Sequence, residues 1–175
     1  DADLTGASLV AADLRGVDAT GATLVNATST EATLEEATLA GADLAESDLR
    51  DASLVAVRAT GADLSEAGCR GVDATGATFA DATLTGADLT DGNLRRADCS
   101  GARLWEVTLD EAVLWDTDVA GADLSDASLV EPFVWRVAFA AADLTDATCV
   151  GFDPDATGAT STGDPPDLAD TRRPT

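Results

Sequence analysis

A period of five residues runs through this chain without an insertion or deletion from residue 2 to residue 151. Every fifth residue from Leu4 to Cys149 is apolar or small, and nineteen of these thirty residues are Leu. Two residues before each of them lies a second column, which is Ala at twenty-one positions. This period fits neither an amphipathic helix, at 3.6 residues, nor a strand, at two. It indicates a chain that turns a corner every five residues, with one large and one small side chain facing inward on each side.

A period of twenty is superimposed on the period of five. Every twentieth residue from Leu4 to Leu144 is Leu, and every twentieth residue from Ala2 to Ala142 is Ala. Four five-residue units therefore make one coil, which predicts about 7.5 coils. At the ~4.8 Å spacing of paired strands, the rod would be roughly 36 Å long. A tight corner favours Gly, and Gly often precedes this Ala, at Gly21, Gly41, Gly61, Gly101 and Gly121.

The units Ala42-Asp43-Leu44 and Ala62-Asp63-Leu64 follow the motif A(D/N)LXX, and the pattern resembles the pentapeptide-repeat family over about six-sevenths of the chain. The resemblance implies an all-β fold, a right-handed quadrilateral parallel β-helix with four pentapeptides per coil. We expect one solenoid domain over residues 2–151, with a local distortion at Pro132, which occupies an inward small position and has no N–H to donate to the ladder. Residues 152–175 are rich in Pro, Gly, Asp and Thr and are expected to form a largely disordered tail, after Phe152 has covered the last coil.

The net charge of −23 makes bare nucleic acid and anionic membrane surfaces poor partners. All ten basic residues are Arg. An acidic surface without lysine is what a high-salt cytoplasm favours, because salt screens its self-repulsion. The alternative is that the acidity attracts a basic protein that normally grips nucleic acid. The chain contains no apolar run long enough for a membrane span, and we expect a cytoplasmic protein.

The sequence lacks the usual means of catalysis. It contains no His and no Lys that would act as a base for Ser or Cys, so we expect no enzyme activity and no cofactor. Cys69, Cys99 and Cys149 occupy inward Leu positions, where a small buried hydrophobe is the expected role. No CxxC pair or calcium-loop repeat indicates a metal site.

The charge is distributed unevenly over the four sides of the predicted rod. Sides 1 to 4, centred in the first coil on Leu4, Leu9, Leu14 and Ala19, carry net charges of −9, −6, −1 and −3. On side 1, acidic residues recur at intervals of twenty and should stack. Like charges one strand apart repel, and a fold seldom needs them for stability. The stacked acids therefore form a candidate partner-binding surface, made of Asp43, Glu46, Asp63, Glu66, Asp123, Asp126, Asp143 and Asp146.

Two functions remain open for such a surface. The first is a non-catalytic interaction module or structural scaffold whose acidity is adapted to salt. The second follows from the resemblance, since some pentapeptide-repeat proteins imitate duplex DNA, bind DNA gyrase and protect it from quinolones. B-DNA carries one charge per ~1.7 Å, hence roughly 21 charges over the expected rod. The coils here carry −19 in total, which is a similar linear density.

Side 3 is nearly neutral and carries an aromatic patch, made of Val113, Trp115, Phe133, Trp135 and Arg136. Trp115 and Trp135 are twenty residues apart and should lie one above the other. Exposed Trp and Phe beside Arg are typical of interfaces. The pattern predicts either a homodimer through the C-terminal coils or a patch covered by the C-terminal tail.

Overall fold

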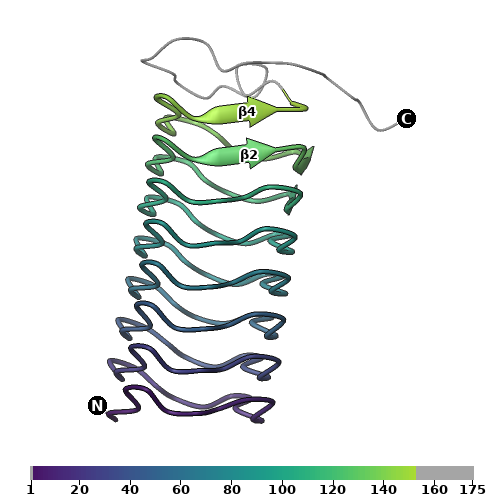
Figure 1. Cartoon of the computed structure of the whole chain (residues 1–175). Helices are drawn as coiled ribbons and strands as arrows, with labels where there is room; N and C mark the ends of the chain where they lie inside the picture. Colours follow the sequence, from purple (N-terminus) through teal and green to yellow (C-terminus); the bar gives the residue numbers. More distant parts are fainter. Residues whose placement is uncertain (1, 153–175) are drawn as a thin grey trace.

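The computed structural model describes residues 2–152, and over this range the chain is a right-handed, four-sided parallel β-helix (Figure 1). Each coil lies on the next with a shift of twenty residues, as in the parallel bridge between Asp43 and Asp63. The predicted register and architecture are therefore confirmed. Residues 2–152 contain no helix that is long and apolar enough to cross a membrane.

Within residues 2–152, three-residue strands occur only in the last coils, where the bridges lengthen. They are β1 (Val113–Trp115), β2 (Ser128–Val130), β3 (Phe133–Trp135) and β4 (Thr148–Val150). Strand β1 pairs with β3 on side 3, and β2 pairs with β4 on side 2, both in parallel. Elsewhere each side contributes one bridge residue per coil, because a corner follows within two residues.

Each five-residue unit contains a small position, a strand position, a central position and two corner positions, in that order. In the unit centred on Leu44, the N–H groups of Asp43, Leu44 and Glu46 donate to carbonyls of neighbouring coils at 2.9, 2.6 and 2.8 Å. The N–H of Ala42 donates across the preceding corner at 3.0 Å. The backbone thus uses four of the five donors in the unit and leaves only the N–H of Ala45, at the first corner position.

The second corner position is left-handed throughout the rod. Its φ is positive in all thirty units, for example 60° at Gly41 and 57° at Glu46. A positive φ at the third residue of a corner is the requirement of a type II turn and favours Gly. The glycines expected at corners lie at this position. In nineteen of the thirty units, however, the residue here is not Gly. The surrounding ladder therefore imposes the conformation on residues that disfavour it.

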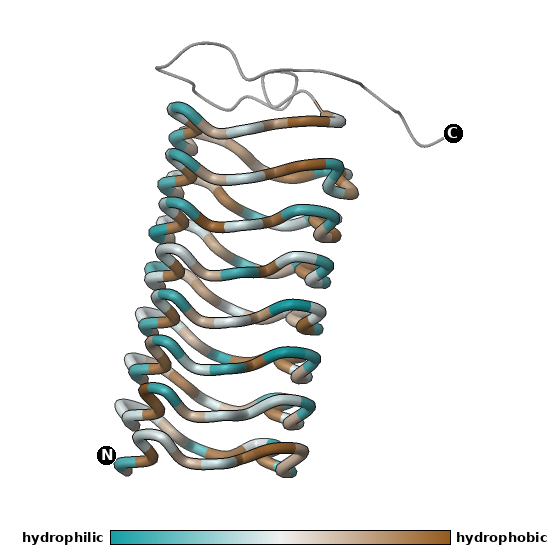
Figure 2. The backbone as a smooth tube through the Cα atoms, viewed as in Figure 1, coloured by the Kyte–Doolittle hydropathy of each residue, from teal (hydrophilic) through white to brown (hydrophobic). Residues whose placement is uncertain are grey.

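The interior is a stack of apolar side chains from the small and central positions, and Figure 2 shows hydrophobic and hydrophilic residues recurring along every coil. In one coil a central side chain larger than Leu occurs together with smaller ones. Phe79 replaces the usual Leu and is 2 % exposed, while Cys69 and Ala74 in the same coil are smaller than Leu. Such an exchange helps to keep this coil close-packed.

The stretch around Pro132 remains in register, because β3 pairs residue by residue with β1. Pro132 is buried at a small position, as expected, and Val134 is only partly buried. The expected consequence needs one correction. The N–H of a small position serves the corner and not the ladder, so Pro132 removes a corner hydrogen bond and leaves the ladder intact.

The C-terminal end of the described rod is covered by an aromatic pair. Phe152 is 8 % exposed and stacks on Phe139, with ring centroids 6.0 Å apart. Phe152 therefore closes the last coil as expected. The tail predicted to be disordered, or to cover side 3, comprises residues 152–175, and all of it after Phe152 lies outside the described residues.

Candidate functional site

The aspartates at strand positions are hydrogen-bonded to the donor that the backbone leaves over. Asp63 Oδ1 accepts the N–H of Ser65 at 2.9 Å and its hydroxyl at 2.5 Å. The same backbone bond is made at all twelve strand-position aspartates and at Asn93. The D/N of the motif is thus explained by the one unsatisfied N–H per unit, because an unpaired backbone donor is costly.

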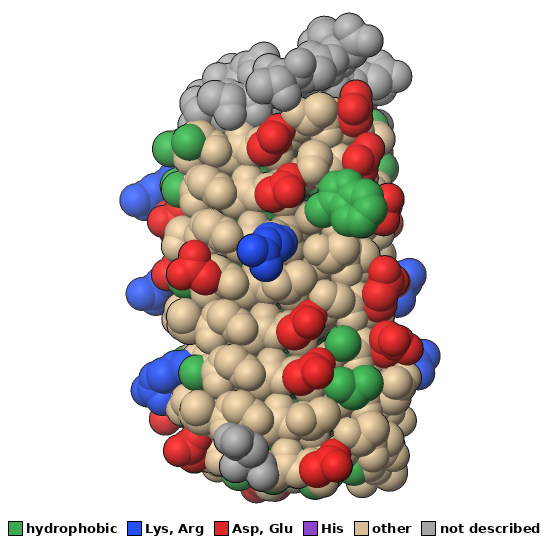
Figure 3. Space-filling model, turned by 90° about the vertical axis from the view of Figure 1, so that its left-hand side faces the viewer, with side chains coloured by type: hydrophobic (Ala, Val, Ile, Leu, Met, Phe, Trp, Pro, Cys, Tyr) green, Lys and Arg blue, Asp and Glu red, His purple; other side chains and the backbone are tan. Residues whose placement is uncertain are grey.

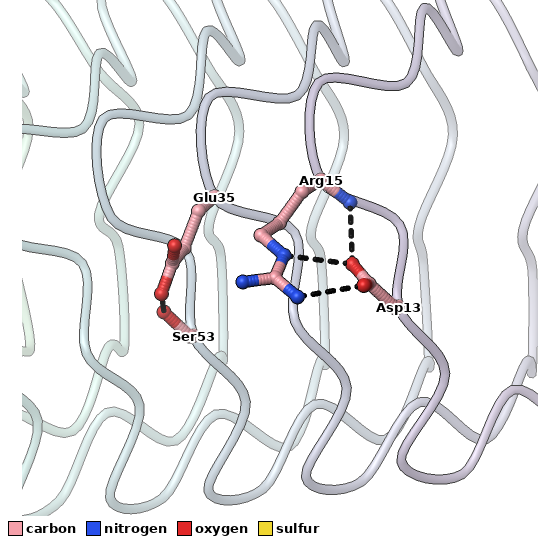
Figure 4. A network of polar contacts seen from close by, with 4 residues as sticks. All are labelled: Asp13, Arg15, Glu35 and Ser53. Atoms are coloured by element: carbon pink, nitrogen blue, oxygen red, sulfur yellow. Dashed lines mark hydrogen bonds and ion pairs between the residues drawn. The ribbon is translucent and has the colours of Figure 1, made fainter.

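These bonds favour the charged form of the carboxyl group. The hydroxyl and then the N–H of Thr145 lower the pKa of Asp143, and Thr5 and Thr20 do the same for Asp3 and Asp18. Arginine replaces the hydroxyl at some units. Arg15 donates from Nε and Nη2 to both oxygens of Asp13, at 2.9 and 2.7 Å (Figure 4). The pKa of Asp13 is lowered first by this side-chain bond.

This arrangement corrects one sequence argument about side 1. The expectation was that the fold seldom needs its stacked acids. In the structure Asp43, Asp63, Asp123 and Asp143 each accept a first-corner N–H at 2.9–3.1 Å. These four therefore have a structural role irrespective of any partner, and their negative charge is not by itself a sign of binding.

The other four predicted acids are at second corner positions, on the outside of the corners. Glu46, Glu66, Asp126 and Asp146 are exposed. Within the described range, no arginine pairs with any of them. The fold does not require a carboxylate at this position, since Gly occupies it in many other units.

Second-corner acids gather along two edges of the rod. Of the thirteen in the coils, five lie on side 1 and five on side 2, where the second set is Glu31, Asp51, Asp91, Glu111 and Glu131. The first set is Glu46, Glu66, Glu106, Asp126 and Asp146. Because the second corner of each side adjoins the next side, these two rows border side 2 on both edges. Acidic side chains recur along the rod axis in the face drawn in Figure 3.

The aromatic patch on side 3 is assembled by the pairing of β1 with β3. Trp115 and Trp135 lie in one column, with ring centroids 6.1 Å apart and planes at 86°. The guanidinium carbon of Arg95 lies 4.2 Å from the centre of the Trp115 ring. Phe133 and Trp135 are each 57 % exposed, and Arg136 Nε bonds Asp116 at 3.1 Å. The structure therefore brings the five predicted patch residues together. A homodimer through these coils stays a prediction.

One exposed aromatic on side 1 was not singled out from the sequence. Trp105 is 41 % exposed, and its Nε1 donates to Asp126 at 2.9 Å. The bond joins consecutive coils and fixes one of the predicted acids. The sequence does indicate Trp105, because an aromatic residue stands at a first corner position between the two acidic columns of side 1.

The cysteines fit the buried structural role predicted for them. All three are free thiols in the interior, and burial raises the pKa of Cys69 and Cys99 to about 12. Over residues 2–152, no group of three or more acidic or Cys side chains is arranged to hold a metal ion.

Comparisons with known proteins agree with this architecture. The family description "Pentapeptide repeats" matches in eight copies, over residues 1–28, 30–65, 52–91 and 93–130. No curated protein sequence matches the chain.

The chain is similar to several solved structures. A trypsin-treated variant of QnrB1, a plasmid-mediated fluoroquinolone resistance protein, is 22 % identical, with a TM-score of 0.51 over 93 % of this chain and 90 % of that one. Rfr23, a pentapeptide repeat protein from the cyanobacterium Cyanothece 51142, is 28 % identical, with a TM-score of 0.48 over 49 % of this chain and 58 % of that one. The matched region thus spans little more than half of Rfr23. At these identities the likeness to QnrB1 shows the fold alone. The family match, which covers well over half of the chain, shows that this protein belongs to the pentapeptide-repeat family.

Proposed function

We propose that this protein is a non-catalytic interaction module that presents a rigid acidic surface to another protein in the cytoplasm. Proteins of the pentapeptide-repeat family are generally structural or interaction modules. The observation that carries the proposal is the pair of exposed acid rows bordering side 2, which the fold does not require. The rows are held on a backbone in which each coil is hydrogen-bonded to the next.

The chemistry of these rows selects a basic partner. Carboxylates spaced at one coil, ~4.8 Å, on a stiff rod give a linear field that attracts Arg and Lys. Both arginines of side 2 are already engaged. Arg50 pairs with Asp48 at 2.6 Å, and Arg70 lies 3.7 Å from Asp88 and 3.8 Å from Asp91. The edges of side 2 therefore keep most of their negative charge for a partner.

A second candidate is that the rod imitates DNA and occupies the DNA site of a type II topoisomerase such as gyrase, inhibiting it or protecting it from quinolones. The charge of the coils, −19 over a rod of roughly 36 Å, favours it, because B-DNA would carry roughly 21 charges over that length. The fold shared with the fluoroquinolone resistance protein QnrB1 makes the test worthwhile.

The test is DNA supercoiling by purified gyrase with this protein titrated in, at low and high salt, with and without a quinolone. DNA mimicry predicts inhibition or quinolone protection that fades as salt rises. The diagnostic variant carries Glu46→Gln and Glu66→Gln, which remove charge from one acid row and leave the strand-position bonds intact. The matched control carries Asp81→Asn and Asp98→Asn, which remove the same charge from side 4.

Loss of the effect in the side 1 variant, with an intact effect in the side 4 variant, would support an acidic surface that works by position. Equal loss in both would mean that only total charge matters. If the wild-type protein has no effect at a large molar excess, DNA mimicry is wrong and the interaction module remains.

A further inference from the structure

The aromatic patch contains one cation–π pair that is already formed. The guanidinium of Arg95 lies over the ring of Trp115 with its carbon 4.2 Å from the ring centre. Arg95 Nε is buried and has no hydrogen-bond partner in the described part of the chain. Arg95 is therefore held on this side mainly by stacking on the indole, an interaction that Arg makes more readily than Lys.

One coil later the same column presents an indole without such a cation. Trp135 lies above Trp115, perpendicular to it at 86°. Trp135 and Phe133 are each 57 % exposed and are two residues apart on β3, so both project from the same face. The exposed surface of Trp135 and Phe133 is thus continuous with the Arg95–Trp115 pair in the preceding coils.

The electrostatic surroundings of this surface are asymmetric. On the edge shared with side 2, Glu111 precedes β1 and Glu131 precedes β3, each by two residues. Both are exposed, and neither forms an ion pair among residues 2–152. On the opposite edge Arg136 is held by Asp116 at 3.1 Å. The negative charge beside Phe133 is therefore uncompensated, whereas the positive charge of Arg136 is paired.

We propose that Phe133, Trp135, Glu111 and Glu131 form the docking site for an arginine-bearing segment of a basic protein. A guanidinium of that segment stacks on Trp135, as Arg95 stacks on Trp115, and neighbouring basic groups pair with the two glutamates. Charge complementarity favours this occupant over a second copy of the chain, since two chains of −23 repel one another. The inference rests on the proposed function for its basic partner. It adds that Trp135 anchors the partner and that the site prefers Arg to Lys.

The experiment uses fluorescently labelled octa-arginine and octa-lysine peptides, which have the same charge. Their affinities for the full chain are measured by fluorescence anisotropy at 0.15 M and 1 M NaCl. We expect octa-arginine to bind more tightly, and the ratio of the two affinities to persist at 1 M salt, where the Debye length is about 3 Å. Replacing Trp135 by Leu keeps an apolar side chain but removes the π surface, and should weaken octa-arginine binding roughly two- to five-fold with little effect on octa-lysine.

Two further variants separate stacking from charge. The double variant Glu111→Gln, Glu131→Gln should weaken the binding of both peptides at 0.15 M salt and leave the ratio of their affinities unchanged. Thr75→Ala, in the same outward column three coils below Trp135, is the matched control and should change neither. Circular dichroism confirms that each variant is folded.

The outcomes distinguish this inference from the proposed function. If both peptides bind and Trp135→Leu leaves the ratio of their affinities unchanged, Trp135 is not the anchor. The proposal of an acidic interaction module then still stands. If neither peptide binds at 0.15 M salt, both are wrong. If sedimentation shows self-association that Trp135→Leu abolishes, a second copy occupies the patch and the inference is overturned.

Discussion

The hydrogen bond from a first-corner N–H to a strand-position carboxylate predicts a specific pair of stability effects at Asp98. This residue lies on side 4, away from the acid rows. Its Oδ1 accepts the N–H of Ser100 at 3.0 Å and the hydroxyl of Ser100 at 2.6 Å. Asp98→Asn retains an acceptor oxygen in the same place, whereas Asp98→Ala removes it. Asn93 shows that an amide works here, since its Oδ1 accepts the N–H of Arg95 at 3.3 Å.

The magnitudes follow from the exposure of the site. Asp98 and Ser100 are half-buried, so water replaces the lost acceptor only in part. Removing a comparable side-chain cap from a backbone N–H costs about 1 kcal/mol, and each net hydrogen bond contributes about 0.5–1.5 kcal/mol. We therefore expect Asp98→Ala to cost about 1–2 kcal/mol and Asp98→Asn less than about 0.5 kcal/mol. For a domain of this size the Ala variant should lose roughly 2–8 °C in Tm.

The assay is thermal and urea unfolding followed by circular dichroism, with the three proteins compared in the same buffer. Measurements at 0.1 M and 1 M NaCl separate the hydrogen bond from charge repulsion, because only the repulsion is screened. If Asn and Ala destabilise the chain equally, the charge of Asp98 matters and the bond to Ser100 does not. If neither changes the midpoint, our explanation of the motif Asp is wrong.

Three further predictions test the interior and the acids. Cys69 and Cys99, whose pKa burial raises to about 12, should resist iodoacetamide at pH 8 in the folded chain and react in denaturant, so native labelling at the denatured rate would contradict their burial. The pKa of Asp143 lies below its ordinary value of 3.8, so its stabilisation is complete above that pH and lost as the pH falls through the folded pKa. Urea titrations from pH 5 to pH 2 in 1 M NaCl should show Asp143→Asn losing less stability than wild type, and parallel curves would contradict this. Phe79→Leu should cost about 1 kcal/mol through the void it leaves and Ala74→Leu about 1–3 kcal/mol through overpacking. The double variant should lose less stability than the sum of the two single losses. Strict additivity of the two losses would contradict compensation within the coil.

The fold was predictable because a period of five leaves few alternatives. With Leu44 and Leu64 twenty residues apart, one register places every apolar column inside, and the structure has that register. The position of Trp135 in the same column as Trp115 followed from the same arithmetic. Both are consequences of periodicity alone and needed no knowledge of side-chain geometry.

The features that sequence reasoning missed depend on where individual hydrogen bonds point. The role of Asp63 emerges only when every N–H of its unit is assigned and that of Ser65 is left over. The bond from Trp105 to Asp126 depends on side-chain torsions that no repeat pattern specifies. A positive φ at Glu46 runs against residue preference and follows from the ladder. Periodicity therefore predicted the backbone, while the meaning of the acids required the structure.

The division of the acids into two kinds changes the comparison between salt adaptation and partner binding. Strand-position aspartates satisfy the backbone and occur on all four sides, so they favour neither explanation. Second-corner acids accept no such backbone N–H. An adaptation to salt alone would place them on every edge of the rod. Ten of the thirteen in the coils instead border side 2, and side 4 has only Asp81 at this position. Salt adaptation gives no reason for this sidedness, whereas a basic partner lying across side 2 does, and the edge of Glu111 and Glu131 would bring that partner onto Trp135.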